Sequence, residues 1–140
     1  MYEDREPTEM ELRARKTVGG TYLPEELDVS ILETFPYEYQ GRKITVEFKT
    51  HEFTSVCPYS GLPDFATVFI TYVPDKKCLE LKSLKYYLYA YRQVRMFNEH
   101  IVNKLLEDLS KVAEPVSMKI VAEFTNRGGM FNTVAAEYEK

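Results

Sequence analysis

The sequence has only two cysteines, Cys57 and Cys78, among 140 residues, too few for a disulfide framework. It has no run close to the ~18 consecutive apolar residues that a membrane-spanning helix needs. The N-terminal stretch MYEDREPTEMELRARK is charged from its start and lacks the apolar core of a secretory signal. We therefore expect a protein without a membrane segment, located in a reducing cytoplasm.

A basic excess is also missing. The chain carries 18 Lys and Arg against 22 Asp and Glu, a net charge of −4, and its basic residues are scattered among acidic ones. Nucleic-acid-binding domains usually carry a basic stripe, so direct binding to tRNA or DNA is not expected. A small-molecule partner fits this charge balance better.

Soft metal ligands are equally scarce. Cys57, Cys78, His51 and His100 form no C-x-x-C or H-x-x-x-H pair, so no metal site is expected. We interpret Cys78 as a small filler at the end of a strand and His51 as a loop residue.

The length is that of one domain, which can bury roughly 68% of its unfolded-chain surface. Residues 1–20 mix both signs of charge and end in two glycines, so we predict a mobile or loosely docked N-terminal arm. Residues 21–140 then form a single domain, in which 23–39 show no sustained period and are interpreted as an irregular covering segment.

Four segments have the pattern of β-strands. The stretch ITVEFKT, residues 44–50, alternates apolar and polar side chains, which predicts a strand with one buried face. Residues 65–73 are apolar on both faces and predict a central strand. Residues 116–124 alternate again, and 130–139 are expected to pair back after the turn TNRGG.

Two segments between these pairs of strands have a helical period. Leu84, Tyr87, Leu88 and Tyr91 recur at i, i+3, i+4 and i+7 and predict a helix with Ser83 as its N-cap. A second amphipathic helix is expected from an Asn98 N-cap to a stop at Pro115.

The resulting order, β-β-α-α-β-β, predicts an α+β fold with both helices on one face of an antiparallel sheet. Its open edges would be removed if several subunits joined their sheets into a ring, so we expect an oligomer.

The stretch TSVCPYSGLPD lies between the first two strands and contains Cys57. Pro58, Gly61 and Pro63 exclude a helix from the cysteine to Asp64. A tight double turn can bring the thiol and the carboxyl group together, an arrangement that suits covalent catalysis. The alternative is that Cys57 fills a small apolar space and Asp64 is only a turn residue.

Three segments together resemble one enzyme family: FTSVCPYSGLPDFA, LELKSLKYYLYAYR and FNEH. They are similar to the nitrile reductases that make 7-aminomethyl-7-deazaguanine from 7-cyano-7-deazaguanine in queuosine biosynthesis. The family signature Glu-(Ser/Leu)-Lys-(Ser/Ala)-x-Lys-x-(Tyr/Phe/Trp) is met by ELKSLKYY, residues 80–87, and FTNRGG also resembles the family. The resemblance runs from about residue 32 to residue 129 and is to the short, single-module type.

The resemblance implies a tunnelling fold, the architecture shared with GTP cyclohydrolase I. In that fold subunits close their sheets into a barrel, commonly as a decamer of two stacked pentamers, with active sites between neighbours. It also implies NADPH as the co-substrate. The lack of paired metal ligands argues against the zinc-using cyclohydrolase branch.

For catalysis, the resemblance implies that Cys57 attacks the nitrile carbon to form a thioimide while Asp64 donates a proton to the nitrogen. One hydride gives a species that expels Cys57 and leaves an imine, and a second NADPH reduces the imine to the amine. A free thiol titrates near ~8.5 and must be biased towards thiolate. No cation neighbours Cys57 in the sequence, so Asp64 or the N–H groups of the turn are the candidates for this bias.

For substrate recognition, we assign Glu99 to the adjacent N–H donors of the guanine-like ring. The alternative is an acid in the first turn of a helix, favoured by the helix dipole. Asn98 replaces the histidine usual in the family, and His100 points about 200° away on a helix. The family's other substrate-side segment is matched by Leu79, Glu80 and Leu81.

For the NADPH phosphates, the resemblance implies Lys82 and Lys85. Both could instead form the polar face of the first helix. Arg127, which precedes two glycines, is a further candidate because of its charge and the accessible backbone beside it.

Two rival functions stay open. Thiol peroxidases also carry Thr three residues before a reactive cysteine followed by Pro, but that cysteine opens a helix, which Gly61 and Pro63 forbid here. The second rival is a non-catalytic binder of pterin- or purine-like rings on the same scaffold. It predicts ligand binding without a covalent adduct.

Overall fold

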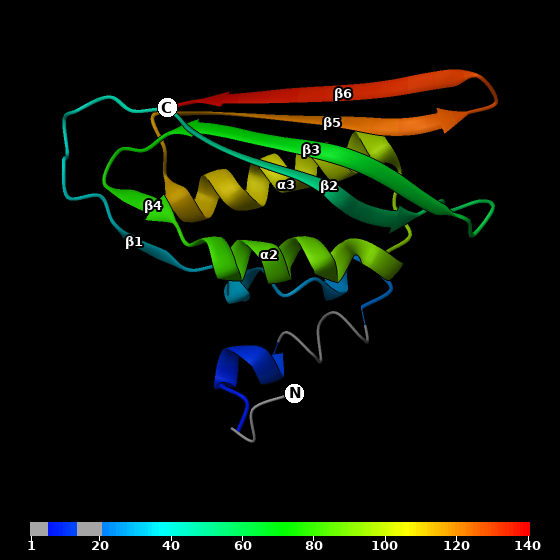
Figure 1. Cartoon of the computed structure of the whole chain (residues 1–140), viewed down its shortest axis with the longest axis horizontal. Coiled ribbons are helices and arrows are strands. Elements are labelled where there is room, and N and C mark those ends of the chain that lie inside the picture. The colour runs from blue at the N-terminus through cyan, green and yellow to red at the C-terminus, as the bar shows by residue number, and fades with distance from the viewer. Residues whose placement is uncertain (1–5, 14–20) are drawn as a thin grey trace.

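The computed structural model describes residues 6–13 and 21–140 (Figure 1). Its main sheet is antiparallel with the order β2-β3-β5-β6. These strands are β2 (Val46–Val56), β3 (Pro63–Val73), β5 (Ser117–Arg127) and β6 (Met130–Glu139). The four predicted strands are confirmed, and β3 is central. The strand predicted over residues 44–50 ends too early, because β2 continues to Val56 through a bulge between Thr50 and Phe53.

Two helices cover one face of this sheet (Figure 1). They are α2 (Leu81–Tyr89), continued by the 3-10 turn η3 (Ala90–Gln93), and α3 (Asn98–Ala113). Apolar residues on one side of β3 and β5 pack against the buried faces of both helices in a single core. The predicted α+β arrangement is confirmed within one chain, and Pro115 follows the end of α3 as expected.

Both predicted N-caps are wrong. Glu80, not Ser83, caps α2, because its carboxylate accepts hydrogen bonds from the N–H groups of Lys82 (2.6 Å) and Ser83 (2.8 Å). The Ser83 hydroxyl is buried and donates to the carbonyl of Glu80 (3.0 Å). Asn98 is the first residue of α3, after Phe97 in extended backbone. A carboxylate with two acceptor oxygens serves two N–H groups at once, so α2 begins earlier than the apolar period suggests.

The predicted irregular segment contains a strand. Thr34–Pro36 form β1, which pairs antiparallel with β4 (Lys77–Leu79) in a separate two-stranded sheet. The 3-10 turns η1 (Pro24–Glu26) and η2 (Val29–Ile31) precede it. Ile31 is fully buried in the core, so the segment does act as a cover. The strand was missed because three residues are too short to show a period.

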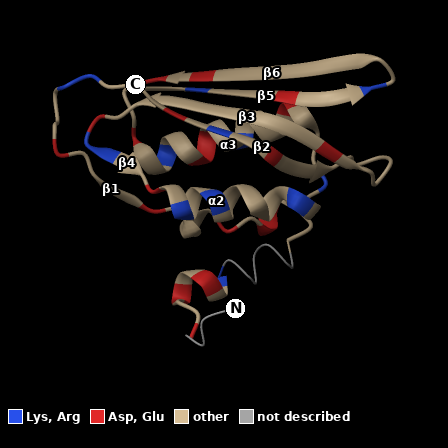
Figure 2. Ribbon diagram, viewed as in Figure 1, with Lys and Arg blue, Asp and Glu red and all other residues tan. Residues whose placement is uncertain are grey.

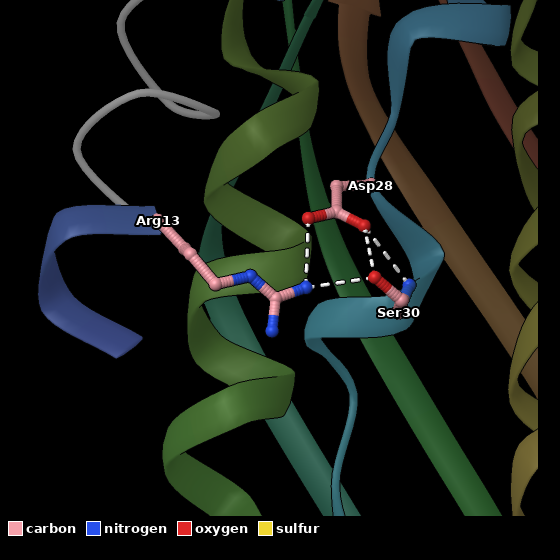
Figure 3. Close-up of polar contacts among 3 residues, drawn as sticks. All are labelled: Arg13, Asp28 and Ser30. Atoms are coloured by element: carbon pink, nitrogen blue, oxygen red, sulfur yellow. Dashed lines mark hydrogen bonds and ion pairs between the residues drawn. The ribbon is translucent and has the colours of Figure 1, made fainter. Parts of the chain in front are cut away.

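Part of the N-terminal arm has a defined position. Residues 9–13 are helical, and the Arg13 guanidinium donates to the carboxylate of Asp28 (2.9 Å) and the hydroxyl of Ser30 (2.7 Å) (Figure 3). The hydroxyl of Ser30 and then Arg13 hold the pKa of Asp28 below its ordinary value. The mobility predicted for residues 1–20 stays a prediction, and 1–5 and 14–20 lie outside the described residues.

Basic and acidic residues are interspersed over the elements (Figure 2), as the sequence suggests. In the part of the chain that the structure describes, no helix combines the length and apolar character needed to cross a membrane.

Candidate active site

A tight turn holds Cys57 at the end of β2. The N–H of Cys57 donates to the carbonyl of Leu62 (2.9 Å), and the N–H of Gly61 donates to the carbonyl of Cys57 (3.0 Å). Gly61 has a φ of +71°, a conformation that glycine adopts without strain. As the sequence predicted, no helix runs through this segment, and the chain returns at once into β3.

The turn itself favours the thiolate. The Ser60 hydroxyl, followed by the backbone N–H groups of Ser60 and Tyr59, lowers the pKa of Cys57 to about 7. The negative charge of Asp64 acts in the opposite direction. Of the two candidates from the sequence, the turn donors favour ionisation of the thiol and Asp64 opposes it.

Asp64 is buried at the start of β3, opposite Ser55 of β2. Its Oδ1 lies 2.9 Å from Nη2 of Arg127, and the same nitrogen donates to the carbonyl of Pro63 (2.8 Å). The Ser55 hydroxyl is fully buried and has no hydrogen-bond partner among the described residues. The structure therefore brings together a thiol with a lowered pKa, a shielded carboxylate and an arginine.

The start of α3 lies at the same end of the sheet. A short parallel bridge joins Val56 to Arg95, with the N–H of Met96 donating to the carbonyl of Val56 (3.2 Å). It places the loop before α3 beside the residue that precedes Cys57. Asn98 is half-buried and Glu99 exposed at the first turn of α3.

An aromatic contact ties these two segments together. The ring of Phe97 packs edge-on against that of Tyr59 in the Cys57 turn, with 5.4 Å between the ring centroids. His100 also contacts Phe97 (5.9 Å between ring centroids). Four of the expected site residues, Cys57, Asp64, Asn98 and Glu99, thus share one end of the molecule.

The other expected substrate residues lie at the opposite end of β3. The N–H of Leu79 donates to the hydroxyl of Tyr72 (2.9 Å). Tyr72 is eight residues from Asp64 along β3, or about 26 Å at ~3.3 Å per residue. Leu79, Glu80 and Leu81 therefore cannot share a small ligand with Cys57 of the same chain. Leu81 is nevertheless exposed and the Glu80 carboxylate is only partly covered.

The cations expected to contact the cofactor divide between the two ends. Lys82 is exposed on α2, and its Nζ lies 3.8 Å from a carboxylate oxygen of Glu11. Lys85 lies with its Nζ 5.0 Å from the centroid of the Tyr86 ring and lines an apolar cavity of about 210 Å³ between α2 and β2. Arg127 is at the Cys57 end. The two lysines are accessible to an anion, whereas Arg127 is engaged within the chain.

Several features of the site were not anticipated. Ser60 could have been noticed as a hydroxyl three residues after the cysteine within one turn. The contact between Arg127 and Asp64 joins residues far apart in the sequence. His51 is not a loop residue: it lies at the bulge in β2, with Nδ1 3.2 Å from the hydroxyl of Thr67. Cys78 is buried in β4, and burial raises the pKa of its thiol.

Within residues 6–13 and 21–140, no three His, Cys, Asp or Glu side chains are grouped closely enough to hold a metal ion. The reactive groups that the site presents are the thiol and the carboxylate at the turn. An accessible thiolate with an acid–base partner and an adjacent aromatic pair is suited to covalent chemistry on a flat, electrophilic ligand.

Comparison with known proteins agrees with this class of site. The model of the family described as QueF-like protein matches residues 63–140. A protein from Caldicellulosiruptor bescii, named NADPH-dependent 7-cyano-7-deazaguanine reductase, is 51% identical over 119 residues, covering 85% of this chain and 91% of its own length. A protein of the same name from Thermoanaerobacter pseudethanolicus is 48% identical over 120 residues, covering 86% and 90%.

Among solved structures, the apo form of an archaeosine synthase named QueF-Like superposes with a TM-score of 0.62 at 28% identity, covering 66% of this chain and 91% of that chain. The chain belongs to the QueF-like family, so the family resemblance inferred from its motifs is confirmed.

Proposed function

We propose that this protein is an NADPH-dependent 7-cyano-7-deazaguanine reductase, an oxidoreductase that converts the nitrile of its substrate to a primary amine for queuosine biosynthesis. Two relatives with this name are 48–51% identical to the chain, and the match covers nearly their whole length. The observation that carries the proposal is the Cys57 turn, in which three hydrogen-bond donors lower the pKa of an accessible thiol to about 7 beside the buried carboxylate of Asp64.

Chemistry at the turn begins with addition of Cys57 to the nitrile. The sulfur attacks the nitrile carbon, a C–S bond forms, and the triple bond becomes a C=N bond. The proton lost by the thiol passes through Asp64 to the nitrogen, so charge and atoms balance and a neutral thioimide results. The burial of Asp64 keeps water from competing for that proton.

Substrate recognition is assigned to Glu99 and Asn98 at the start of α3. Glu99 is exposed, so its two oxygens are available to accept adjacent N–H groups of a guanine-like ring. Asn98 can donate or accept one hydrogen bond there but cannot carry a positive charge, unlike a histidine.

Two lysines of α2 suit the phosphate groups of NADPH. Lys82 and Lys85 are both exposed on one helix, and the contact of Lys82 with Glu11 is longer than a hydrogen bond, so both ammonium groups can bind an anion. NADPH, when bound, supplies hydride, and two equivalents with two protons account for the four electrons between nitrile and amine. We therefore assign Lys82 and Lys85 to cofactor binding.

We also propose that the site is completed by a second subunit in a barrel of the tunnelling type, as a decamer of two pentamers. The separation of about 26 Å between Asp64 and Tyr72 along β3 supports this, because Glu80 and Cys57 can then meet only across an interface. Apart from the Val56–Arg95 bridge, the outer edges of β2 and β6 have no strand partner among the described residues, so both can pair with a neighbour.

Intact mass tests the chemistry directly. Incubation with 7-cyano-7-deazaguanine and no NADPH should increase the protein mass by that of the ligand, and Cys57→Ala should show no increase while keeping the same oligomer size. Ligand binding to the wild type without a mass increase would favour the non-catalytic binder of purine-like rings and remove the covalent route.

A further inference from the structure

Arg127 is the last residue of β5, and its position is set by the turn that follows. Gly128 and Gly129 both have positive φ, +57° and +81°, and Arg127 pairs with Met130 across the hairpin. A turn with two residues of positive φ fixes the direction of the flanking strands. The hairpin therefore fixes the position of the Arg127 backbone, from which the side chain extends.

The Arg127 guanidinium reaches across to the start of β3. Nη2 lies 2.9 Å from Oδ1 of Asp64 and donates to the carbonyl of Pro63 at 2.8 Å. The β3–β5 ladder ends at the pair Ala66–Phe124, and β5 has one extra residue between Phe124 and Arg127 in its pairing with β6. Arg127 therefore lies beyond this ladder, where its side chain reaches the first two residues of β3.

The surroundings of Asp64 make this contact consequential. Its side chain is 11% exposed, against 45% for Arg127, so water can contribute little to orienting the carboxylate. A shielded carboxylate depends on its partner for both solvation and direction. The same positive charge offsets the negative charge of Asp64, which otherwise opposes ionisation of the Cys57 thiol.

We propose that Arg127 is a positioning residue that holds the Asp64 carboxyl group beside Cys57 for proton transfer to the nitrile nitrogen. This assignment differs from a role in binding NADPH phosphate, and it rests on the covalent function proposed above. Lys82 and Lys85, on α2, have no contact with Asp64 or Cys57 among the described residues. They are the cations left for the cofactor.

Formation of the thioimide without NADPH separates the two roles, because that step needs Asp64 but no cofactor. The rate of mass increase with 7-cyano-7-deazaguanine is measured for wild type, Arg127→Gln and Lys119→Gln. Lys119 is a matched control: it lies on the same strand and makes an exposed ion pair with Glu137 (3.5 Å). We expect the adduct rate of Arg127→Gln to fall at least about tenfold, as is usual when general acid–base catalysis is impaired, with Lys119→Gln unchanged.

A double-mutant cycle tests whether Arg127 acts through Asp64. The loss caused by Arg127→Gln should disappear when Asp64 is already Asn, because there is then no carboxylate to position. Should Arg127→Gln lose its fold, Arg127→Lys gives the same comparison, since it keeps the charge but cannot hold the carboxylate and the Pro63 carbonyl with a planar group.

Wild-type adduct rates in both Arg127 variants, with only the KM for NADPH raised, would overturn the positioning role and leave the covalent reaction intact. Failure of the wild type to form an adduct would overturn the covalent function and this role together.

Discussion

Removal of the Ser60 hydroxyl should raise the pKa of Cys57, because this hydroxyl is the largest of the three groups that lower the pKa to about 7 from 9.0. With a pKa near 7, half of the thiol is ionised at pH 7, against about 1% for a pKa of 9, a roughly 50-fold difference in thiolate. Ser60→Ala keeps the two backbone N–H donors, so the pKa of the variant lies between these values.

The rate changes less than the thiolate fraction. A more basic thiolate is intrinsically more nucleophilic, by roughly 6- to 10-fold over two pKa units. If the whole shift were lost, alkylation at pH 7 would fall by only about 5- to 8-fold. Above both pKa values, the variant would react faster than the wild type. The two pH–rate curves should therefore cross, and this crossing distinguishes a shifted pKa from a simple loss of access to the sulfur.

The assay is alkylation of Cys57 by iodoacetamide from roughly pH 6 to pH 10, followed by intact mass in a Cys78→Ala background so that only one thiol reacts. Ser110→Ala is the control, since that hydroxyl donates to the carbonyl of Glu107 (3.3 Å) within α3. An apparent pKa in Ser60→Ala equal to that of the wild type, or a wild-type pKa near that of free cysteine, would refute the assignment of the turn as the activating group.

Three further changes probe the fold around the site. Gly61→Ala should lower the free energy of unfolding by about 1–2 kcal/mol, since φ at this residue is +71°. Urea unfolding should show a lower midpoint with an unchanged slope, and an unchanged midpoint would contradict the expected backbone strain. Tyr87→Phe should lower the free energy of unfolding by about 1–3 kcal/mol, because the buried Tyr87 hydroxyl donates to Asp108 at 2.5 Å. Thermal unfolding measures this loss, and equal melting temperatures would contradict it. Arg13→Ala should change stability by less than about 1 kcal/mol, because its ion pair with Asp28 is partly exposed; a larger loss would mean that the N-terminal helix is integral to the fold.

Burial patterns were predictable from the sequence because they are local. Along β5, Met118, Ile120, Ala122 and Phe124 are buried, as the alternation in residues 116–124 predicts, whereas Val116, which shares this alternation, lies just before the strand and is exposed. The start of α2 was not predictable from this pattern, because it depends on the Glu80 carboxylate competing successfully for free N–H groups. The β1 strand depends on a partner more than forty residues away, and three residues carry no signal of that pairing.

The candidate site divides in the same way. Proline and glycine positions around Cys57 were enough to predict a turn that exposes a thiol near Asp64. The contact between Arg127 and Asp64 joins residues 63 positions apart, and it exists only because β3 and β5 pair in one register. A slip of one residue would turn the side chains of the slipped strand to the other face of the sheet, so neither residue type nor spacing along the chain could indicate the contact.

In the proposed assembly, the length of β3 also explains why the two groups of candidate site residues in one chain do not meet. Its 11 residues extend for roughly 33–37 Å, far more than the size of a purine-like ligand, with Asp64 near one end and Tyr72 near the other. The signature residues Glu80 to Lys85 follow the far end because β4 and the cap of α2 come directly after this strand.

The proposed assembly through strand edges is tested by measuring oligomer size, by size exclusion, on variants that block edge pairing. Lys49→Pro in β2 or Ala135→Pro in β6 should dissociate the assembly, because proline removes a ladder hydrogen bond. The same variants should lose NADPH oxidation. A dissociated monomer that still reduced the nitrile at the normal rate would show that one chain holds the complete site after all.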